Sequence, residues 1–123
     1  MKAQDLRIGN WVTSFDGGFI QVNGYLISML HDHPNHNMKP YPIELDSEIF
    51  IKAGFEYCRV GSTVLKLNIS NEDEEYPCSL QVSGSGIQVC RCGIGAICSP
   101  VFYLHELQNL YYALTQNELI ITP

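Results

Sequence analysis

Hydrophobic positions recur with helical spacing over only one long stretch of the chain, Ser99 to Leu119. The apolar side chains of this stretch share one arc of a helical wheel; they are Tyr103, Leu104, Leu107, Leu110, Tyr111 and Leu114. Ser99 can cap the first turn and Pro100 suits the first helical position, so we expect a helix from about residue 100 to residue 116. The pattern predicts a C-terminal helix with one face in the core.

Shorter alternating segments elsewhere predict antiparallel strands. Leu6–Val12 and Phe19–Leu30 alternate well enough for two or three curled strands, which resemble the start of a small SH3-like barrel. Glu56–Ser70 predicts a hairpin, and Cys78–Val82 with Ile87–Cys92 predicts a second strand pair. We expect these strands to form one sheet that packs against the C-terminal helix.

One short helix is predicted within Pro42–Phe55. Asp46 is a suitable N-cap, and Gly54 can end the helix in the left-handed conformation. The predicted fold class is therefore α+β: a curled antiparallel sheet, with an SH3-like N-terminal portion, packed on a long C-terminal helix plus one short helix. Because 123 residues suffice to bury a core, we expect residues 1–123 to form a single domain.

Composition narrows the range of partners. Hydrophobic residues make up 46% of the chain, charged residues only 16%, and the formal net charge is −6. So few charges predict a covered face and a homo-oligomer, while only seven Lys and Arg residues argue against a nucleic-acid partner. The chain has no apolar run of about 18 residues and no signal-peptide pattern, so we expect no membrane association and a cytoplasmic protein.

Three of the five cysteines lie close together in the sequence, at Cys90, Cys92 and Cys98. Arg91 between them could lower a thiolate pKa, so a metal or redox site is one interpretation. The other is that these thiols are small hydrophobic core residues. The second interpretation is favoured because C-x-C differs from the C-x₂-C spacing of structural zinc sites.

The same segment suggests an anion-binding pocket. Two glycines precede the predicted N-terminus of the C-terminal helix, whose free amide groups can bind an anion. The third glycine and the lysine of nucleotide-binding motifs are missing. The candidate ligand-binding residues are Arg91, Gly93, Gly95 and Ser99.

Three imidazoles occur within six residues, at His31, His33 and His36, with Asp32 beside the first. Neutral imidazole nitrogens are good metal ligands, so these three histidines are candidate metal ligands. The alternative is a solvated polar loop, which is favoured because Pro34 interrupts the segment and no helical spacing aligns the rings.

The polar arc of the predicted C-terminal helix carries several uncharged groups. Gln108 and Asn109 lie in mid-helix beside Tyr112, and His105 is expected on the same exposed side. Gln108 and Asn109 could bond to neighbouring loops or to the first strand; alternatively, these four residues form an interaction surface. No Ser-His-Asp or Cys-His arrangement is indicated, so we expect no catalytic residue, no cofactor and no enzymatic activity.

Three segments carry a resemblance to a known family: LRIGNWV at residues 6–12, PIELDSEIFIKAGF at 42–55 and LHELQNLYYALTQNEL at 104–119. They are similar to the patterns RIGN-x-V, P-I-x-L-x-x-E-x-L-x-K-x-G-F and V-H-x-L-Q-N-L-Y-F-A-L-T-G-x-E-L. These patterns belong to a family of small uncharacterised proteins encoded in phage, prophage and mobile-element regions of gut bacteria. Gln116 stands where the family has glycine. The resemblance implies a phage accessory protein and assigns no activity.

Together these observations favour a non-enzymatic protein-interaction module of phage or mobile-element origin, with a protein partner. An alternative is a protein that sequesters a small ligand, such as a nucleotide signal of host defence. That alternative requires a basic-lined pocket near Gly93–Pro100 that includes Arg91 or Arg59. A weaker alternative is a metal-binding protein that uses the His31–His36 loop.

Overall fold

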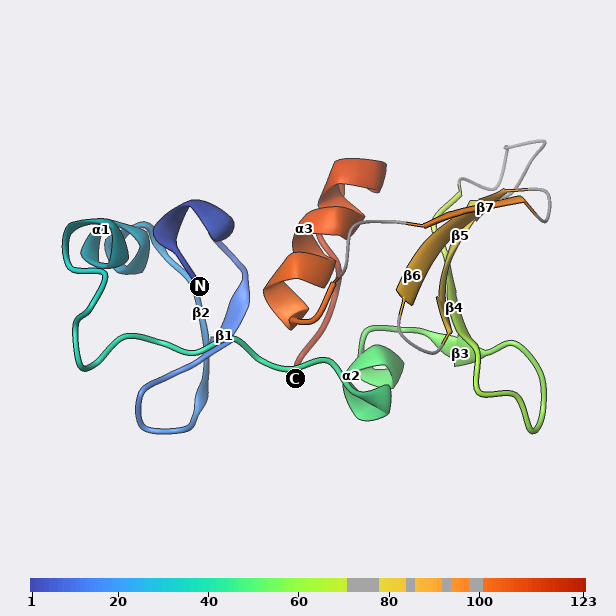
Figure 1. Ribbon diagram of the computed structural model, residues 1–123, viewed down its shortest axis with the longest axis horizontal. Coiled ribbons are helices and arrows are strands. Elements are labelled where there is room, and N and C mark those ends of the chain that lie inside the picture. The colour runs from blue at the N-terminus through green and yellow to red at the C-terminus, as the bar shows by residue number, and fades with distance from the viewer. Residues whose placement is uncertain (71–77, 84–85, 92–93, 98–100) are drawn as a thin grey trace.

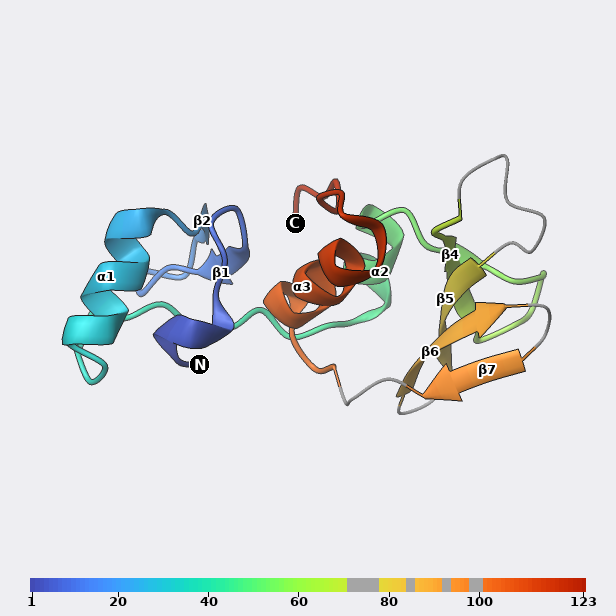
Figure 2. The same cartoon turned by 90° about the horizontal axis from the view of Figure 1, so that it is seen from above.

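A computed structural model describes residues 1–70, 78–83, 86–91, 94–97 and 101–123 (Figure 1). In chain order the elements are a 3₁₀ helix η1 (Ala3–Asp5), β1 (Trp11–Thr13), β2 (Phe19–Gln21), α1 (Gly24–Asp32), α2 (Ser47–Lys52), β3 (Glu56–Tyr57), β4 (Leu65–Asn68), β5 (Cys78–Ser83), β6 (Gly86–Arg91), β7 (Ile94–Ile97) and α3 (Leu104–Thr115). The predicted α+β class is confirmed. The molecule is elongated, and α3 lies between the group η1, β1, β2 and α1 and the sheet that contains β3 to β7 (Figures 1 and 2).

The N-terminal hairpin is shorter than predicted because a helix replaces its second half. The strand expected over Phe19–Leu30 ends at Gln21, and α1 begins directly after Asn23. The Asn23 side chain accepts a hydrogen bond from the Leu26 amide at 2.8 Å, which is the geometry of an N-cap. From there Leu26 and Leu30 lie one helical turn apart and pack into the same core cluster. A helix buries Leu30 and packs the neighbouring pair Leu26 and Ile27 against the same cluster, whereas a strand would point Leu26 and Ile27 to opposite faces.

The prediction of a curled, SH3-like sheet is wrong. β1 and β2 form a separate two-stranded antiparallel sheet, and neither sheet in the described part of the chain is curled or closed. Two strands of three residues each are too few and too short to begin a barrel. The switch to helix at Asn23 is the physical reason.

The larger sheet is antiparallel throughout, with the strand order β3-β4-β5-β6-β7 over the described residues. Both predicted strand pairs are confirmed: β3 pairs with β4, and β5 pairs with β6 so that Leu80 faces Val89 and Val82 faces Ile87. Gly61 lies in the turn between β3 and β4 with φ +80°. Leu80 is fully buried, so this face of the sheet forms part of the core.

Helix α2 matches its sequence prediction closely. Asp46 is the N-cap, and its side chain accepts a hydrogen bond from the Ile49 amide at 2.8 Å. Gly54 follows the last turn with φ +97°, and the Phe55 amide then reaches back to the Phe50 carbonyl at 3.0 Å. The rings of Phe50 and Phe55 meet edge to face, 5.1 Å between centroids. The left-handed glycine therefore returns Phe55 to the core.

Helix α3 begins later than predicted, at Leu104 rather than near Pro100. Two backbone hydrogen bonds hold the preceding residues extended: the Leu45 amide donates to the Phe102 carbonyl at 3.0 Å, and the Leu104 amide donates to the Ile43 carbonyl at 2.8 Å. The predicted N-cap Ser99 lies outside the described residues. The first turn is capped instead by Glu106, whose Oε1 accepts from the amides of Phe102 and Tyr103 at 3.1 Å.

Buried residues form two clusters on either side of β1. The larger cluster contains Leu104 and Leu107 of α3 together with Leu65 and Leu80 of the sheet, and the smaller one joins η1, β1 and α1. Successive side chains of a strand point to opposite faces, so β1 serves both clusters: Val12 is in the smaller, while its neighbour Trp11 packs against the larger. In the described part of the chain, no helix is long and apolar enough to cross a membrane.

Candidate functional site

The Arg7–Trp11 segment and α3 are joined by a network of polar side chains. Asn109 Oδ1 accepts from Asn10 Nδ2 at 3.0 Å and from Arg7 Nη1 at 3.3 Å, and Asn109 Nδ2 donates to the Asp5 carbonyl at 2.9 Å. Asn10 is only 1% exposed. Because a buried amide is costly without partners, this pairing fixes the register of the N-terminal segment on α3. Residues 6–12 and α3, which are about a hundred positions apart in the sequence, therefore meet here.

Gln108 extends the network to the backbone of the same segment. Its Oε1 accepts from the Trp11 amide at 2.8 Å, and its Nε2 donates to the Gly9 carbonyl at 3.3 Å. The side chain is 2% exposed. Of the two sequence interpretations, bonding to the first strand is the one that the geometry confirms, and Gln108 is not available to a partner surface.

Arg7 holds the other end of the contact between the N-terminal segment and α3. Its guanidinium forms an ion pair with Glu118 and lies over the Tyr112 ring, with Cζ 3.9 Å from the ring centroid. A guanidinium stacked on an aromatic face gains a cation–π attraction. Tyr112, a candidate interaction residue, is thus half-buried under Arg7.

His105 is buried rather than exposed, so its predicted place on an interaction surface is wrong. The residue is 3% exposed, its ring stacks on that of Tyr103 with 5.9 Å between centroids, and Nδ1 has no hydrogen-bond partner among the described residues. Burial lowers the pKa of His105, while the carboxylates of Glu106 and Asp5 act in the opposite direction. The prediction assumed that one side of the helix faces solvent. Because α3 packs against other segments on two sides, the side that carries His105 is buried as well.

A groove of about 260 Å³ runs beside this network, between the N-terminal segment and the chain after α3. We call it the C-terminal groove; its lining residues are Ile8, Gly9, Trp11, Gln21, Gln108, Glu118, Leu119, Ile120 and Ile121. Ile8 is 68% exposed and Ile120 is 86% exposed. Two large aliphatic side chains therefore stand in solvent among the residues that line a partly apolar groove.

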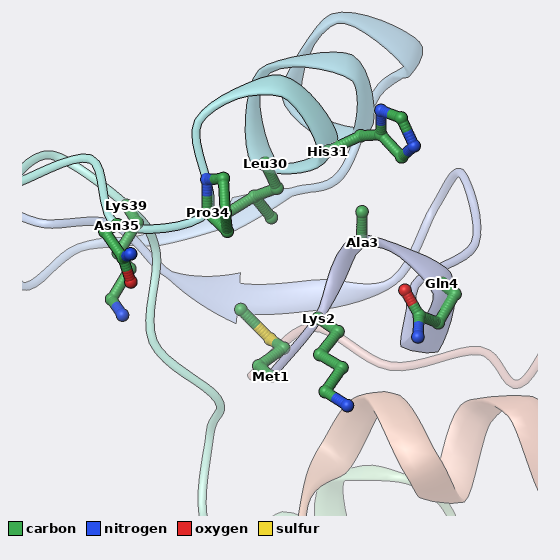
Figure 3. A pocket seen from close by; sticks show the side chains of 9 residues that line it. All are labelled: Met1, Lys2, Ala3, Gln4, Leu30, His31, Pro34, Asn35 and Lys39. Carbon is green, nitrogen blue, oxygen red and sulfur yellow. The ribbon is translucent and has the colours of Figure 1, made fainter.

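A second cavity, of about 420 Å³, lies in the N-terminal group of elements. We call it the N-terminal pocket; it is lined by Met1, Lys2, Ala3, Gln4, Leu30, His31, Pro34, Asn35 and Lys39. Figure 3 shows Met1 and Leu30 in the middle, with Lys39 and Asn35 on one side and Lys2 on another. The pocket thus combines an apolar centre with basic and amide groups around it.

The candidate metal ligands do not converge. His31 lies in the last turn of α1, where its Nδ1 is 3.2 Å from the Asp32 carboxylate, and the ring centroids of His33 and His36 are 6.5 Å apart with the rings tilted. His36 Nδ1 accepts a hydrogen bond from the Met38 amide at 3.0 Å. Within the described ranges, no three His, Cys, Asp or Glu side chains are grouped so that they could hold a metal ion.

The predicted anion pocket near Gly93 lacks its expected geometry where the structure describes it. Gly95 lies within β7, paired with Cys90 of β6, and Arg91 pairs with Ile94. Residues 94–97 are therefore strand rather than a glycine turn that opens a helix. Gly93 and Ser99 lie outside the described residues.

The cysteines are divided between described and undescribed parts of the chain. Cys92 and Cys98 lie outside the described residues, and Cys78 is buried in β5. Cys90 lies in β6, with Sγ 3.9 Å from the Gln88 side chain. Cys78 thus behaves as a small core residue.

Sequence reasoning missed both the C-terminal groove and the N-terminal pocket, because their lining residues come from distant parts of the chain. Ile8 and Ile120 are more than a hundred residues apart, and Lys2 precedes η1 while Lys39 lies between α1 and α2. The one local signal is the apolar pair Ile120–Ile121 directly after the helical pattern, where only Ile121 is buried.

The chain matches no protein-family model, no curated protein and no solved structure at a significant level. Function is therefore inferred from the chain's own residues.

Proposed function

We propose that the protein is a non-enzymatic protein-interaction module, and that the C-terminal groove is its docking surface. The observation that carries the proposal is the exposure of Ile8 and Ile120 beside a groove whose lining residue Gln108 is hydrogen-bonded to the N-terminal segment. Exposed apolar patches rimmed by polar groups are typical of protein-interaction sites. An origin in a phage or mobile element is proposed from the family resemblance alone.

The groove has the construction expected of a binding site. Gln108, Asn109 and Arg7 fix the N-terminal segment on α3, so Ile8 is presented by a backbone that is already ordered. A preordered surface loses less conformational entropy when a partner binds. Trp11 and the buried Ile121 supply an apolar floor, which suits an aliphatic or aromatic anchor from the partner.

The charge of the chain favours a protein partner over a nucleic acid. With a net charge of −6, the chain repels a phosphate backbone, and Glu118 is the charged residue that lines the groove. A segment with an apolar anchor and a neutral or basic flank fits this surface. A second copy of the chain is the other occupant we consider, in keeping with the low proportion of charged residues.

The test compares proteins captured by three immobilised forms of the chain from a lysate of its natural host. The forms are the unaltered chain, the double variant Ile8→Ser with Ile120→Ser, and the control Val60→Ser. Val60 is fully exposed and does not line the groove. Burial of one isoleucine contributes about 1.5–3 kcal/mol, so the double variant should weaken binding about a hundredfold or more.

A partner retained by the unaltered chain and the control but lost from the double variant supports the proposal. Native mass spectrometry of the same three forms identifies the other occupant, since a dimer lost only in the double variant would place a second copy in the groove. Equal capture and equal mass for all three forms would refute the C-terminal groove as a docking surface.

A further inference from the structure

The basic residues of this acidic chain are distributed unevenly. The chain has 13 Asp and Glu against seven Lys and Arg, yet two of its four lysines, Lys2 and Lys39, line the N-terminal pocket. Among the nine described residues that line this pocket, none is acidic. The pocket is therefore a local region of positive charge on a negative protein.

Two carboxylates next to the lining residues in the sequence, Asp5 and Asp32, make other contacts. Asp5 accepts a hydrogen bond from the Lys2 backbone amide at 2.8 Å, and Asp32 lies 3.2 Å from the His31 ring. Asp32 lines a neighbouring cavity of about 290 Å³ instead. The ammonium groups of Lys2 and Lys39 form no ion pair in the described structure. Flexible stems allow both to turn towards a ligand.

The remaining lining of the pocket suits an apolar body attached to the anion. Leu30 is only 3% exposed; in Figure 3 Met1 lies between the two lysines, and Leu30 and Pro34 lie above it. The side-chain amides of Gln4 and Asn35 add hydrogen-bond donors and acceptors beside the lysines. A volume of about 420 Å³ lies within the range of about 300–1,000 Å³ that is usual for small-ligand sites.

We propose that the N-terminal pocket binds a phosphorylated small molecule of the nucleotide class. Lys2 and Lys39 contact the phosphate oxygens, the amides of Gln4 and Asn35 contact polar groups of the ligand, and Leu30 with Pro34 supports its apolar face. The residues that line this pocket all precede Gly93 by more than 50 positions in the sequence, so the site differs from the anion pocket expected there. The proposal uses a different surface from the C-terminal groove and does not depend on it.

The test is isothermal titration of the intact chain at low ionic strength with inorganic phosphate, adenosine, and a panel of nucleoside mono- and diphosphates and cyclic dinucleotides. We expect at least one nucleotide to bind, with adenosine and phosphate each weaker by about tenfold or more because each lacks half of the contacts. Substitution of both lysines, Lys2→Gln with Lys39→Gln, should weaken nucleotide binding by about tenfold or more.

Two matched controls make the result specific. The pair Lys52→Gln with Lys66→Gln removes the same charge at sites that do not line the pocket, and should bind as the unaltered chain does. The groove variant Ile8→Ser with Ile120→Ser should also bind normally, so failure of either proposal is seen separately. Absence of heat with every nucleotide, equal binding of phosphate alone, or equal loss in both lysine pairs would overturn the proposal.

Discussion

Gln116 occupies a backbone conformation that favours glycine, and its replacement by glycine should stabilise the protein. It is the C-cap of α3, with φ +60° and ψ +16°, and among the described residues it is the only non-glycine residue with positive φ. In this left-handed region the Cβ of an L-residue comes too close to the following carbonyl oxygen.

The expected gain follows from two opposing terms. Relief of the left-handed conformation contributes about 1–2 kcal/mol. Glycine has more freedom in the unfolded chain, which costs about 0.4–1 kcal/mol. The Gln116 side chain adds little, because its Nε2 contacts the Tyr112 and Ala113 carbonyls only at 3.4 and 3.5 Å from an exposed position. We therefore expect Gln116→Gly to raise the free energy of unfolding by about 0.5–1 kcal/mol.

Urea unfolding followed by circular dichroism measures this difference directly. The matched control is Ala113→Gly, an exposed position one turn earlier where φ is helical, and it should destabilise the protein by about 1 kcal/mol. Replacement by glycine should thus raise stability at Gln116 and lower it at Ala113, three residues earlier. A Gln116→Gly midpoint equal to or below that of the unaltered chain would refute the argument.

Three further predictions concern the network, the buried histidine and the α2 cap. Asn109→Ala should lower the free energy of unfolding by about 1–3 kcal/mol, because it leaves the buried Asn10 amide without its acceptor. A double-mutant cycle with Asn10→Ala should give a coupling energy of about 1 kcal/mol. Additive effects of the two substitutions would argue against the contact. Burial lowers the pKa of His105 in the folded protein, so the unfolded chain binds the proton first and stability should fall as the pH drops below about 6.5. The variant His105→Phe should therefore lose less stability than the unaltered chain between pH 7.5 and 5.5. Equal decreases in the urea midpoint of the two proteins would contradict this prediction. Gly54→Ala should lower the melting temperature at a cost of about 1 kcal/mol from backbone strain alone, since the new Cβ would lie 3.6 Å from Leu67; an unchanged melting curve would exclude the strain.

The sequence was sufficient to predict those elements whose ends are marked by nearby residues. Asp46 and Gly54 mark the two ends of α2 through a side-chain cap and a left-handed glycine, and both depend on residues within one turn. The hairpin around Gly61 and the β5–β6 pair are likewise short-range, since their strands alternate on either side of a turn. These parts of the fold were predictable from the sequence.

The candidate sites were not predictable, because they depend on contacts between distant segments. Residues 24–32 have apolar spacing compatible with strand or helix, and packing of Leu30 against η1 and β1 selects the helix. His105 and Gln108 occupy the polar arc of α3, yet both are buried because the N-terminal segment covers that side.

The sequence by itself therefore determined the α+β class, the capped helix α2, the hairpins of the larger sheet and most of the apolar arc of α3; Leu114, expected on that arc, is exposed. Each of these follows from a pattern whose physical cause acts within a few residues. Only the tertiary structure decided where α3 begins, which polar side chains are buried, and where the C-terminal groove and the N-terminal pocket lie. The contact of the Arg7–Trp11 segment with α3 bridges about a hundred residues, and long-range packing of this kind leaves no periodic trace in the chain.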